Sequence, residues 1–509
     1  MKYEVVIGLE IHAQLATKSK MFCGCDNNAE GKSPNSATCP ICMGNPGTLP
    51  VINKKALEWT YLFGLALGCE IPNQFNFERK QYFYPDLPKA YQITSQTTPP
   101  LIGGHLEVEV GSDKKIFTIE HIHLEEDAGK LIHSGDHTLV DLNRAGTPLM
   151  EIVTNPDFRS PQEAKAFMQE LQRILRYLGI SSADMEKGHL RCDGNISLRE
   201  FGAEKLGKKV EVKNMNSFAA LERALEYEVK RQGELLDSGR GEEIFQETRG
   251  WDDAKGITVS QRGKEMAHDY RYFPEPDLPP IVIGGGITNL ESGIMNGGID
   301  IEELKKLVPE LPAEKRKRYV EEFGLDKKSI DILVDDANLA RYFESAVEAG
   351  SPRPDSGAET APLQPEKIKK ISNWLLGDAL GYLNAKNQTI FDLKIKPQDL
   401  VILVEKIDSG EISSKIAKEL FIKMAGTGRS SSEIIESEGI KQVSDTGELE
   451  KIVGDIIAAN PAQVDQYKKE LAAGGDTPVL NWFVGQVMKA THGQANPGVV
   501  MDVLKKILG

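Results

Sequence analysis

Apolar and polar residues alternate strictly near the start of the chain. Apolar residues at the odd positions from 9 to 15 are separated by Glu10, His12 and Gln14. A period of two predicts a β-strand with one face in a core. Side chains two positions apart lie about 7 Å from each other along a strand and point the same way. Glu10 and His12 can therefore reach one small cation, although a surface strand with a solvated polar face has the same pattern.

Similar patterns predict an α+β region over the first 293 residues. Alternation predicts strands at residues 4–15, 106–110, 116–124, 190–198 and 210–213. A period of 3.6 predicts helices at residues 54–67, 160–178 and 218–232. The second helix has Ser160 as N-cap, Pro161 at its first position and Glu163 to complete a capping box. Ser217 is the expected N-cap of the third.

The remaining residues have a helical pattern throughout. A glycine-rich stretch at 284–298, including a tight loop or hinge at 284–286, marks the change, and residues 350–365 are predicted to form a loop. Helices are predicted at residues 301–307, 313–323, 328–337, 339–349, 365–384, 398–407, 413–425, 431–438, 446–460, 461–473, 479–491 and 497–508. We therefore expect three domains, at residues 1–293, 294–408 and 409–509.

Length and charge narrow the class of protein. A chain of 509 residues is too long for one core. No run of about 18 apolar residues and no signal peptide are found, so a cytoplasmic protein without a membrane partner is expected. The formal net charge of −15 argues against loose, charge-driven binding of nucleic acid, but it permits a nucleic-acid partner held by local patches and shape.

Four cysteines form two closely spaced pairs. Cys23 and Cys25 are followed by Cys39-Pro-Ile-Cys42. Four thiolates at such spacing can close a tetrahedron around zinc, and a cytosolic chain favours a metal over disulfides. An all-cysteine ligand set favours a structural ion, because a catalytic zinc keeps an open position. The alternative is four reduced thiols in a loop without metal.

A second group of candidate ligands follows on one predicted strand. His121, His123 and Glu125 share one face, and Glu126 and Asp127 follow at its end. So many acids and imidazoles in a short stretch favour a divalent cation, and Mg²⁺ prefers hard oxygen ligands. An exposed, charged strand end is the alternative.

An isolated acid occupies the apolar run at residues 148–154. Glu151 needs a partner there, because burial of an unpaired charge is costly. Arg144, Lys187 or a metal can supply that partner.

Two later stretches add polar pairs on single strand faces. Asp193 and Asn195 share one face, as do Glu211 and Lys213. Carboxylates from separate strands that converge on one sheet face can hold Mg²⁺ and a nucleotide phosphate. Taken singly, each pair is better explained as paired surface charge.

Basic and aromatic residues are interleaved at positions 77–92. Arg79, Lys80 and Lys89 can bind phosphates, and Tyr82 or Tyr84 can stack on bases. Residues 269–277 have a similar composition. The alternative is an ordered surface loop whose aromatic rings pack into the core.

One glycine-rich motif does not indicate chemistry. Residues 426–432 resemble a phosphate loop but lack its Lys-Ser/Thr ending. They lie between two predicted helices, so a turn followed by an N-cap at Ser431 explains them.

Several long motifs together resemble one family. They include Val-Ile-Gly-Leu-Glu-Ile-His-Ala-Gln-Leu at 6–15 and Cys-Pro-Ile-Cys-Met-Gly-Asn-Pro-Gly-Thr-Leu-Pro at 39–50. Others lie at 82–89, 123–130, 141–153, 210–218, 271–278 and 483–491. They resemble GatB, the B-subunit family of the tRNA-dependent amidotransferases GatCAB. The likeness extends over nearly the whole chain.

The resemblance implies an α+β cradle-like domain with an antiparallel sheet, an all-α helical domain and a small all-α, YqeY-like tail that binds tRNA. It implies a carbon–nitrogen ligase that forms a heterotrimer with an amidase (GatA) and a small third protein (GatC). GatB would use ATP to phosphorylate the side-chain carboxylate of Glu-tRNA(Gln), Asp-tRNA(Asn) or both. Ammonia released from glutamine by the amidase would then displace the phosphate.

The matched motifs also imply residue roles. Glu10, His12, Glu125 and Glu151 would surround Mg²⁺, with Asp193 and Glu211 nearby. Arg191 or Lys213 would stabilise the transferred phosphate, and Lys187 would contact the nucleotide. Two other functions remain open from the residues: a tRNA-binding protein of the same complex whose strand acids are only structural, and a zinc-dependent hydrolase that uses the cysteine cluster. The all-cysteine ligand set argues against the hydrolase.

Overall fold

The computed structural model describes residues 2–263, 270–283, 299–351, 363–438, 446–472, 478–491, 495 and 497–509. These divide into two compact units, Met1–Glu314 and Lys315–Gly509. The glycine-rich stretch predicted at 284–298 and most of the loop predicted at 350–365 lie outside the described residues, as does the domain boundary predicted at 293.

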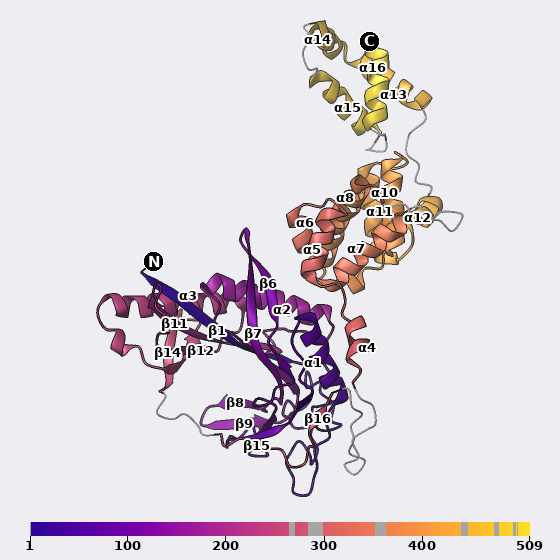
Figure 1. Ribbon diagram of the computed structural model, residues 1–509. Helices are drawn as coiled ribbons and strands as arrows, with labels where there is room; N and C mark the ends of the chain where they lie inside the picture. The colour runs from indigo at the N-terminus through magenta and orange to yellow at the C-terminus, as the bar shows by residue number, and fades with distance from the viewer. Residues whose placement is uncertain are drawn as a thin grey trace. The chain divides into compact units, whose positions relative to one another are not determined.

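The first unit is built on a twelve-stranded sheet (Figure 1). The strands of this sheet are β1 (Tyr3–Gln14), β3 (Glu78–Gln81), β4 (Tyr91–Thr94), β5 (Leu101–Ile102), β6 (His105–Val110), β7 (Asp113–Glu126), β10 (Pro148–Thr154), β11 (Leu190–Glu200), β12 (Val210–Lys213), β13 (Glu247–Asp252), β14 (Ile257–Gly263) and β15 (Phe273–Pro274). Their order is β14-β13-β12-β11-β1-β10-β7-β4-β3-β15, and β5 and β6 pair with β7.

The sheet is mixed rather than purely antiparallel. Strands β12 and β13 are parallel, whereas the other pairs recorded within the described part of the chain are antiparallel. The reason is helix α3 (Phe218–Asp237), which connects these two strands and forms the crossover that a parallel pair requires. Two small antiparallel pairs lie outside the main sheet: β2 (Gln74–Phe75) with β16 (Ile281–Val282), and β8 (Lys130–Ser134) with β9 (His137–Asp141).

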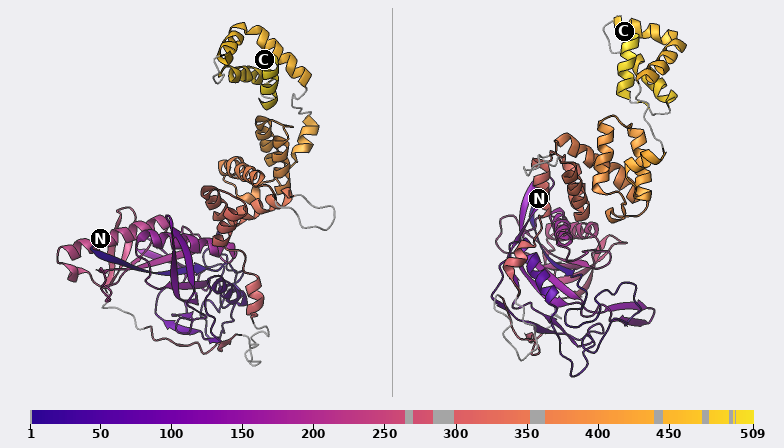
Figure 2. Two further views of the ribbon diagram at one scale, coloured as in Figure 1. Left: turned by 45° about the horizontal axis from the view of Figure 1, so that its top comes forward. Right: turned by 90° about the vertical axis from the view of Figure 1, so that its right-hand side faces the viewer.

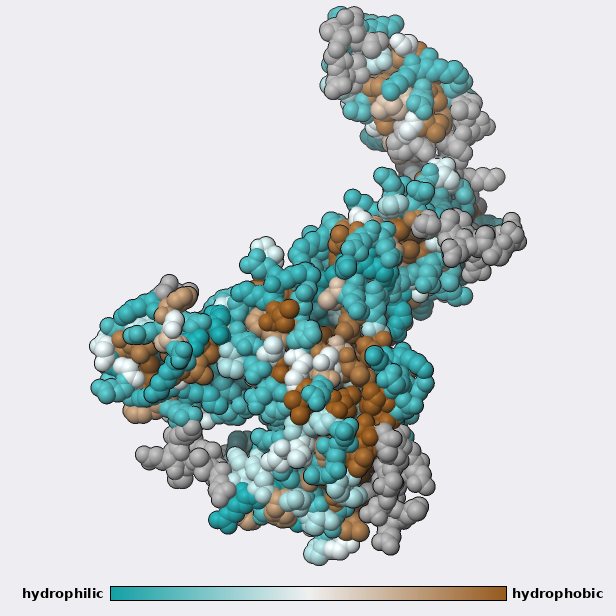
Figure 3. All heavy atoms as spheres, viewed as in Figure 1, coloured by the Kyte–Doolittle hydropathy of each residue, from teal (hydrophilic) through white to brown (hydrophobic). Residues whose placement is uncertain are grey.

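Two helices cover one face of the central strands. Helix α2 (Pro161–Tyr177) packs with α3, and both lie on the same side of the sheet (Figures 1 and 2). The odd-numbered apolar residues of β1 belong to the core that these helices close. The even-numbered polar residues of β1 consequently point to the opposite face. The first helix, α1 (Lys54–Ala66), is also largely buried, and Figure 3 shows hydrophobic side chains gathered around it.

The predicted helix starts are largely confirmed. Ser160 accepts the Glu163 backbone N–H at 3.3 Å, and Pro161 opens α2. The predicted capping box differs in one bond. The Glu163 carboxylate accepts the backbone N–H of Arg159 at 2.6 Å, one residue before the N-cap, and also binds Lys115 at 2.6 Å. Ser217 caps α3 through the Ala220 N–H at 3.0 Å, as expected.

The helices after the sheet confirm the predicted pattern. They are α4 (Ile301–Lys306), α5 (Pro312–Glu321), α6 (Lys327–Asp335), α7 (Ala337–Gly350), α8 (Pro365–Trp374), α9 (Leu380–Ala385), α10 (Pro397–Asp408), α11 (Ser414–Thr427), α12 (Ser431–Glu438), α13 (Thr446–Ala459), α14 (Pro461–Ala472), α15 (Pro478–Ala490) and α16 (Pro497–Leu508). The helix predicted at 365–384 contains a π-helical turn, Leu375–Ala379, between α8 and α9. Helix α10 packs on α11 and α12, whereas α13–α16 enclose a core of their own.

The glycine-rich motif at 426–432 is a helix junction, as predicted. Gly428 ends α11 in the left-handed conformation with φ of 76°. The N-cap of α12 is Ser430 rather than the predicted Ser431, because the Ser430 hydroxyl accepts the Glu433 N–H at 3.3 Å and the Glu433 carboxylate accepts the Ser430 N–H at 2.7 Å. In the described residues, no helix has the length and apolar character needed to cross a membrane.

A buried acid joins α3 to the edge of the sheet. The Glu228 carboxylate is fully buried and accepts bonds from Arg231 at 2.8 Å and Thr258 at 2.5 Å, and it lies 3.2 Å from Arg249. Burial opposes its charge, but the hydrogen bonds from Arg231 and Thr258 outweigh burial and lower the pKa of Glu228.

Glu228→Gln is therefore expected to destabilise the first unit by about 3–5 kcal/mol, because it leaves two arginines beside a neutral amide. The stabilisation by wild-type Glu228 should be complete above pH 4.5, its ordinary pKa, and be lost as the pH falls below that value. Urea unfolding of the variant at pH 7 and of wild type from pH 7 to 3 measures both effects. Glu226→Gln, an exposed position on the same helix, should leave stability unchanged; equal loss in both variants contradicts the prediction.

Candidate functional site

The polar face of the central sheet carries a row of charged side chains. His12 of β1 lies opposite Glu151 of β10, and Glu151 lies opposite His123 of β7. Glu125 lies further along β7, where it pairs with Leu149 of β10. These residues come from strands far apart in sequence, and the strand order β1-β10-β7 makes them neighbours.

Within this row, one histidine and two carboxylates converge. The His12 Nε2 atom lies 3.2 Å from Glu151 Oε2 and 3.8 Å from Glu125 Oε1. One ligand atom from each of the three lies within 4.8 Å of the others. The His123 Nε2 atom lies 3.1 Å from the same Glu151 oxygen and 3.9 Å from Glu125 Oε2. The arrangement can hold a metal ion, and the partners of Glu151 are imidazoles rather than Arg144 or Lys187.

The electrostatics of the row favour a charged imidazole beside an ionised acid. Burial opposes charge on His123, but the carboxylates of Glu151 and Glu125 outweigh burial and raise the pKa of His123 to about 9. The same balance raises the pKa of His12. Burial also opposes charge on Glu151, but His12 and His123 outweigh it and lower the pKa of Glu151.

Several buried polar atoms on this face have no hydrogen-bond partner among the residues that the structure describes. They are Thr94 Oγ1, His121 Nε2, both ring nitrogens of His123, Arg191 Nε and Asn195 Oδ1. Buried polar groups in proteins are normally satisfied, and exceptions need an explanation such as a bound ion, water or ligand. They lie on β7 and on the flanking strands β4 and β11, and such a concentration is typical of a binding site for a polar ligand.

A second polar group lies beside the row. Glu10 of β1 is opposite Asp193 of β11 and accepts a bond from Asn195 Nδ2 at 2.9 Å. Burial, followed by repulsion from Glu151, raises the pKa of Glu10. Lys213 of β12 bridges Asp193 at 2.6 Å and Glu211 at 3.2 Å. Burial opposes its charge, but these two acids outweigh burial and raise the pKa of Lys213.

Arg191 connects the row to a buried aspartate. Its Nη2 atom donates to Asp127 Oδ1 at 3.0 Å, while about 37% of the side chain stays exposed. Asp127 also accepts a bond from Gln14 Nε2 at 2.7 Å and lies 3.6 Å from Arg144 Nε. Burial opposes charge on Asp127, but Arg191 and Arg144 outweigh it and lower its pKa. Asp127 thus orients Arg191 on the polar face.

Lys187 lies apart from this group. Its ammonium is in an exposed ion pair with Glu30 at 2.8 Å.

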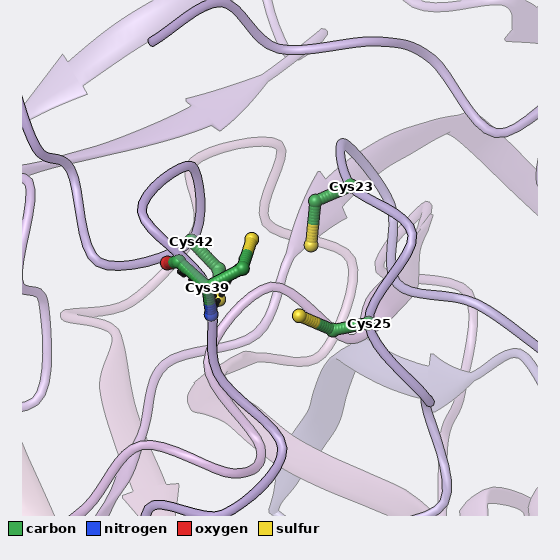
Figure 4. A group of neighbouring side chains, drawn as sticks. All are labelled: Cys23, Cys25, Cys39 and Cys42. Atoms are coloured by element: carbon green, nitrogen blue, oxygen red, sulfur yellow. Dashed lines mark hydrogen bonds between the residues drawn. The ribbon is translucent and has the colours of Figure 1, made fainter.

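The four cysteines of the two sequence pairs form a second cluster, and all four are free thiols. One sulfur from each of Cys23, Cys25, Cys39 and Cys42 lies within 4.8 Å of the others, and their side chains point to a common centre (Figure 4). The hydrogen bond between Cys23 and Cys42 is the largest influence on both thiols: it lowers the pKa of Cys42 and raises that of Cys23. The cluster can hold one metal ion.

The residues predicted to contact tRNA make internal pairs. Arg79 forms two bonds of 2.8 Å with Glu275, and its guanidinium lies 4.3 Å from the ring centre of Tyr91. Lys89 binds Glu126 and lines a cavity beside Cys23 and Cys42.

The other two predicted tRNA contacts meet at one aromatic ring. Lys80 lies 5.0 Å above the ring of Tyr270, and Tyr82 packs edge-on against the same ring at 5.8 Å. The structure therefore joins the two basic-aromatic segments into one surface.

Thr94 was not among the site residues predicted from the sequence. It ends β4 and lies opposite Glu125 of β7, a pairing that no local pattern reveals. His123 was predicted only as a member of the strand face that it shares with His121 and Glu125, and the matched motifs gave it no role of its own.

The comparisons with known proteins identify a family. The family model of the GatB/GatE catalytic domain matches residues 5–289, and that of the GatB domain matches residues 359–508. The chain is 46% identical to the B subunit of the aspartyl/glutamyl-tRNA(Asn/Gln) amidotransferase of Persephonella marina over 508 residues, 100% of each chain. It is 44% and 45% identical to the proteins of the same name from Thermodesulfovibrio yellowstonii and Geotalea daltonii, again over 100% of each chain. The chain belongs to the GatB/GatE family of amidotransferase proteins.

Proposed function

We propose that this chain is the ATP-dependent GatB component of a tRNA-dependent amidotransferase, a glutamine-hydrolysing carbon–nitrogen ligase. It phosphorylates the side-chain carboxylate of Glu-tRNA(Gln), Asp-tRNA(Asn) or both, and ammonia then displaces the phosphate. The amidase GatA supplies the ammonia from glutamine, and the small protein GatC completes the heterotrimer. The observation that carries the proposal is the convergence of His12, Glu125 and Glu151 on a sheet face with unpartnered buried polar atoms.

The donor set fits Mg²⁺ through its carboxylates. Glu125 and Glu151 offer the hard oxygens that this ion prefers, with His12 in the same cluster. Glu10 lies outside this cluster but close enough to Glu151 for their charges to repel. When bound, Mg²⁺ would neutralise charge on the ATP phosphates. The two carboxylates and the imidazole of His12, which would lose its proton on binding the ion, would fix the place of Mg²⁺ on the sheet face. The unpartnered polar atoms would accept or donate bonds to the ligands of the ion.

The cationic side chains have positioning roles. A carboxylate is a poor acylating agent, and in-line transfer of a phosphoryl group depends on orientation and charge stabilisation. Arg191, held by Asp127, and Lys213, held by Asp193 and Glu211, would stabilise the transferred phosphate. Lys187 is the weakest candidate for a nucleotide contact, since its ammonium is paired with Glu30.

The other expected roles belong to the same proposal. The four cysteines would bind a structural zinc ion, which would hold the loop beside the sheet. The segment with Lys80 and Tyr82, joined to Tyr270, and the helices at 409–509 contact the tRNA. Arg79 and Lys89 shape that surface through their carboxylate partners, and the complex works in the cytoplasm.

Glu125→Gln in the reconstituted trimer separates a kinase from a protein that only binds tRNA. We expect ATP hydrolysis dependent on misacylated tRNA to fall by about 10²–10³-fold, because an ionic metal ligand becomes a neutral amide. Binding of tRNA should not change. Glu107→Gln, on an exposed pair with Lys114, is the matched control. Hydrolysis that survives in the Glu125 variant would show that the strand acids are structural.

A further inference from the structure

Lys20 is a buried lysine in the loop that carries the cysteines. Its residue is only 1% exposed. Its ammonium donates to the carbonyl oxygens of Ala37 at 2.8 Å and Leu142 at 3.4 Å, and it lies 3.9 Å from Cys42 Sγ. An ammonium has three protons, so these three acceptors account for all of them. Burying a cation in this way is costly unless a negative group compensates it.

The compensating group is not a carboxylate of the described residues. Among the ion pairs of the residues that the structure describes, none joins Lys20 to an acid. The nearby carboxylate of Glu126 forms its ion pair with Lys89. The remaining source of negative charge is the sulfur cluster. Four thiolates around one divalent ion keep two negative charges, which need neutralising groups around them. The Cys39 backbone N–H, 3.1 Å from Cys42 Sγ, is a second donor to the same sulfur.

We propose that Lys20 is the charge-compensating residue of the cysteine metal site, and that it raises the affinity of the four thiolates for zinc. The inference rests on the zinc binding proposed above. Lys20 also ties the cysteine loop to Leu142, in the connection between β9 and β10, so metal binding and the placement of that connection are linked through one side chain.

Lys20→Met and Lys20→Gln test whether the positive charge of Lys20 raises the zinc affinity. Methionine keeps much of the length of the side chain, and glutamine keeps a hydrogen-bond donor, but neither carries charge; the second variant serves if the first fails to fold. Zinc affinity of the full-length protein is measured by competition with a coloured chelator. We expect the dissociation constant to rise by about 10–100-fold in both variants. Lys32→Met, which removes an ammonium paired with Asp26 in the same loop, should bind zinc as wild type does.

Melting temperatures of the zinc-loaded and zinc-free forms separate this role from simple loop anchoring. Charge compensation predicts that the Lys20 variants lower the melting temperature of the loaded form and leave the zinc-free form unchanged or more stable. Equal losses in both forms, or unchanged zinc affinity, overturn the proposal for Lys20. A wild-type protein that binds no zinc overturns the proposed zinc site itself, so the two failures are distinguishable.

Discussion

Replacing Glu151 with glutamine is expected to lower tRNA-dependent ATP hydrolysis by about 10²–10³-fold, because a bound metal supplies several kcal/mol of charge stabilisation and each ~1.36 kcal/mol is tenfold in rate. Glu151 is the acid that both His12 and His123 approach, at 3.2 and 3.1 Å. A neutral amide removes one metal ligand and also the negative charge that keeps the pKa of His123 at about 9.

The Mg²⁺ dependence of this reaction distinguishes a ligand from a structural acid. We expect the variant to need a higher Mg²⁺ concentration for half-maximal activity. Glu58→Gln on α1, whose carboxylate pairs with surface lysines, should behave as wild type. A lower rate with unchanged Mg²⁺ dependence would assign Glu151 to charge pairing with the two histidines alone.

Cys42→Ser is expected to abolish zinc binding and to destabilise the loop at residues 18–53. Structural zinc contributes about 10–16 kcal/mol of binding free energy in zinc-finger peptides, and this energy becomes folding energy where the site forms only in the folded state. Zinc content, measured by elemental analysis, should fall from one ion per chain to none. The first unit should also melt at a lower temperature and be cut by protease within the loop.

The chain provides a matched control for this experiment. Cys69 is a partly buried thiol outside the cluster, and burial raises its pKa. Cys69→Ser should retain zinc and protease resistance. A Cys42 variant with full zinc content would contradict a four-thiolate site.

Local patterns were sufficient for much of the fold. The helix starts at Ser160 and Ser217 follow from short polar side chains that accept backbone N–H groups, which depend only on neighbours in sequence. The alternation over β1 predicted which side chains face the core. The parallel pair β12–β13 did not follow, because it depends on where α3 returns the chain to the sheet.

In the candidate site, too, local patterns predicted the residues but not their partners. Glu10, His12, Glu125 and Glu151 stand out because acids and imidazoles are unusual in strands with a buried face. Their partners were not predictable: Arg144 and Lys187 were candidates for Glu151, and the structure instead places His12 and His123 there. The pairing follows from the register of β1, β10 and β7.

The sequence by itself determined the strand and helix periods, the cysteine pairs and the family, because each depends on residue types at short spacing or on long matching motifs. The tertiary structure decided which charges meet. It placed Glu151 between two imidazoles and buried Lys20 beside Cys42. It also paired Arg79 with Glu275 and Lys89 with Glu126. The physical reason is that strand order and register bring together side chains far apart in the chain, such as His12 and Glu151, and no local pattern contains that information.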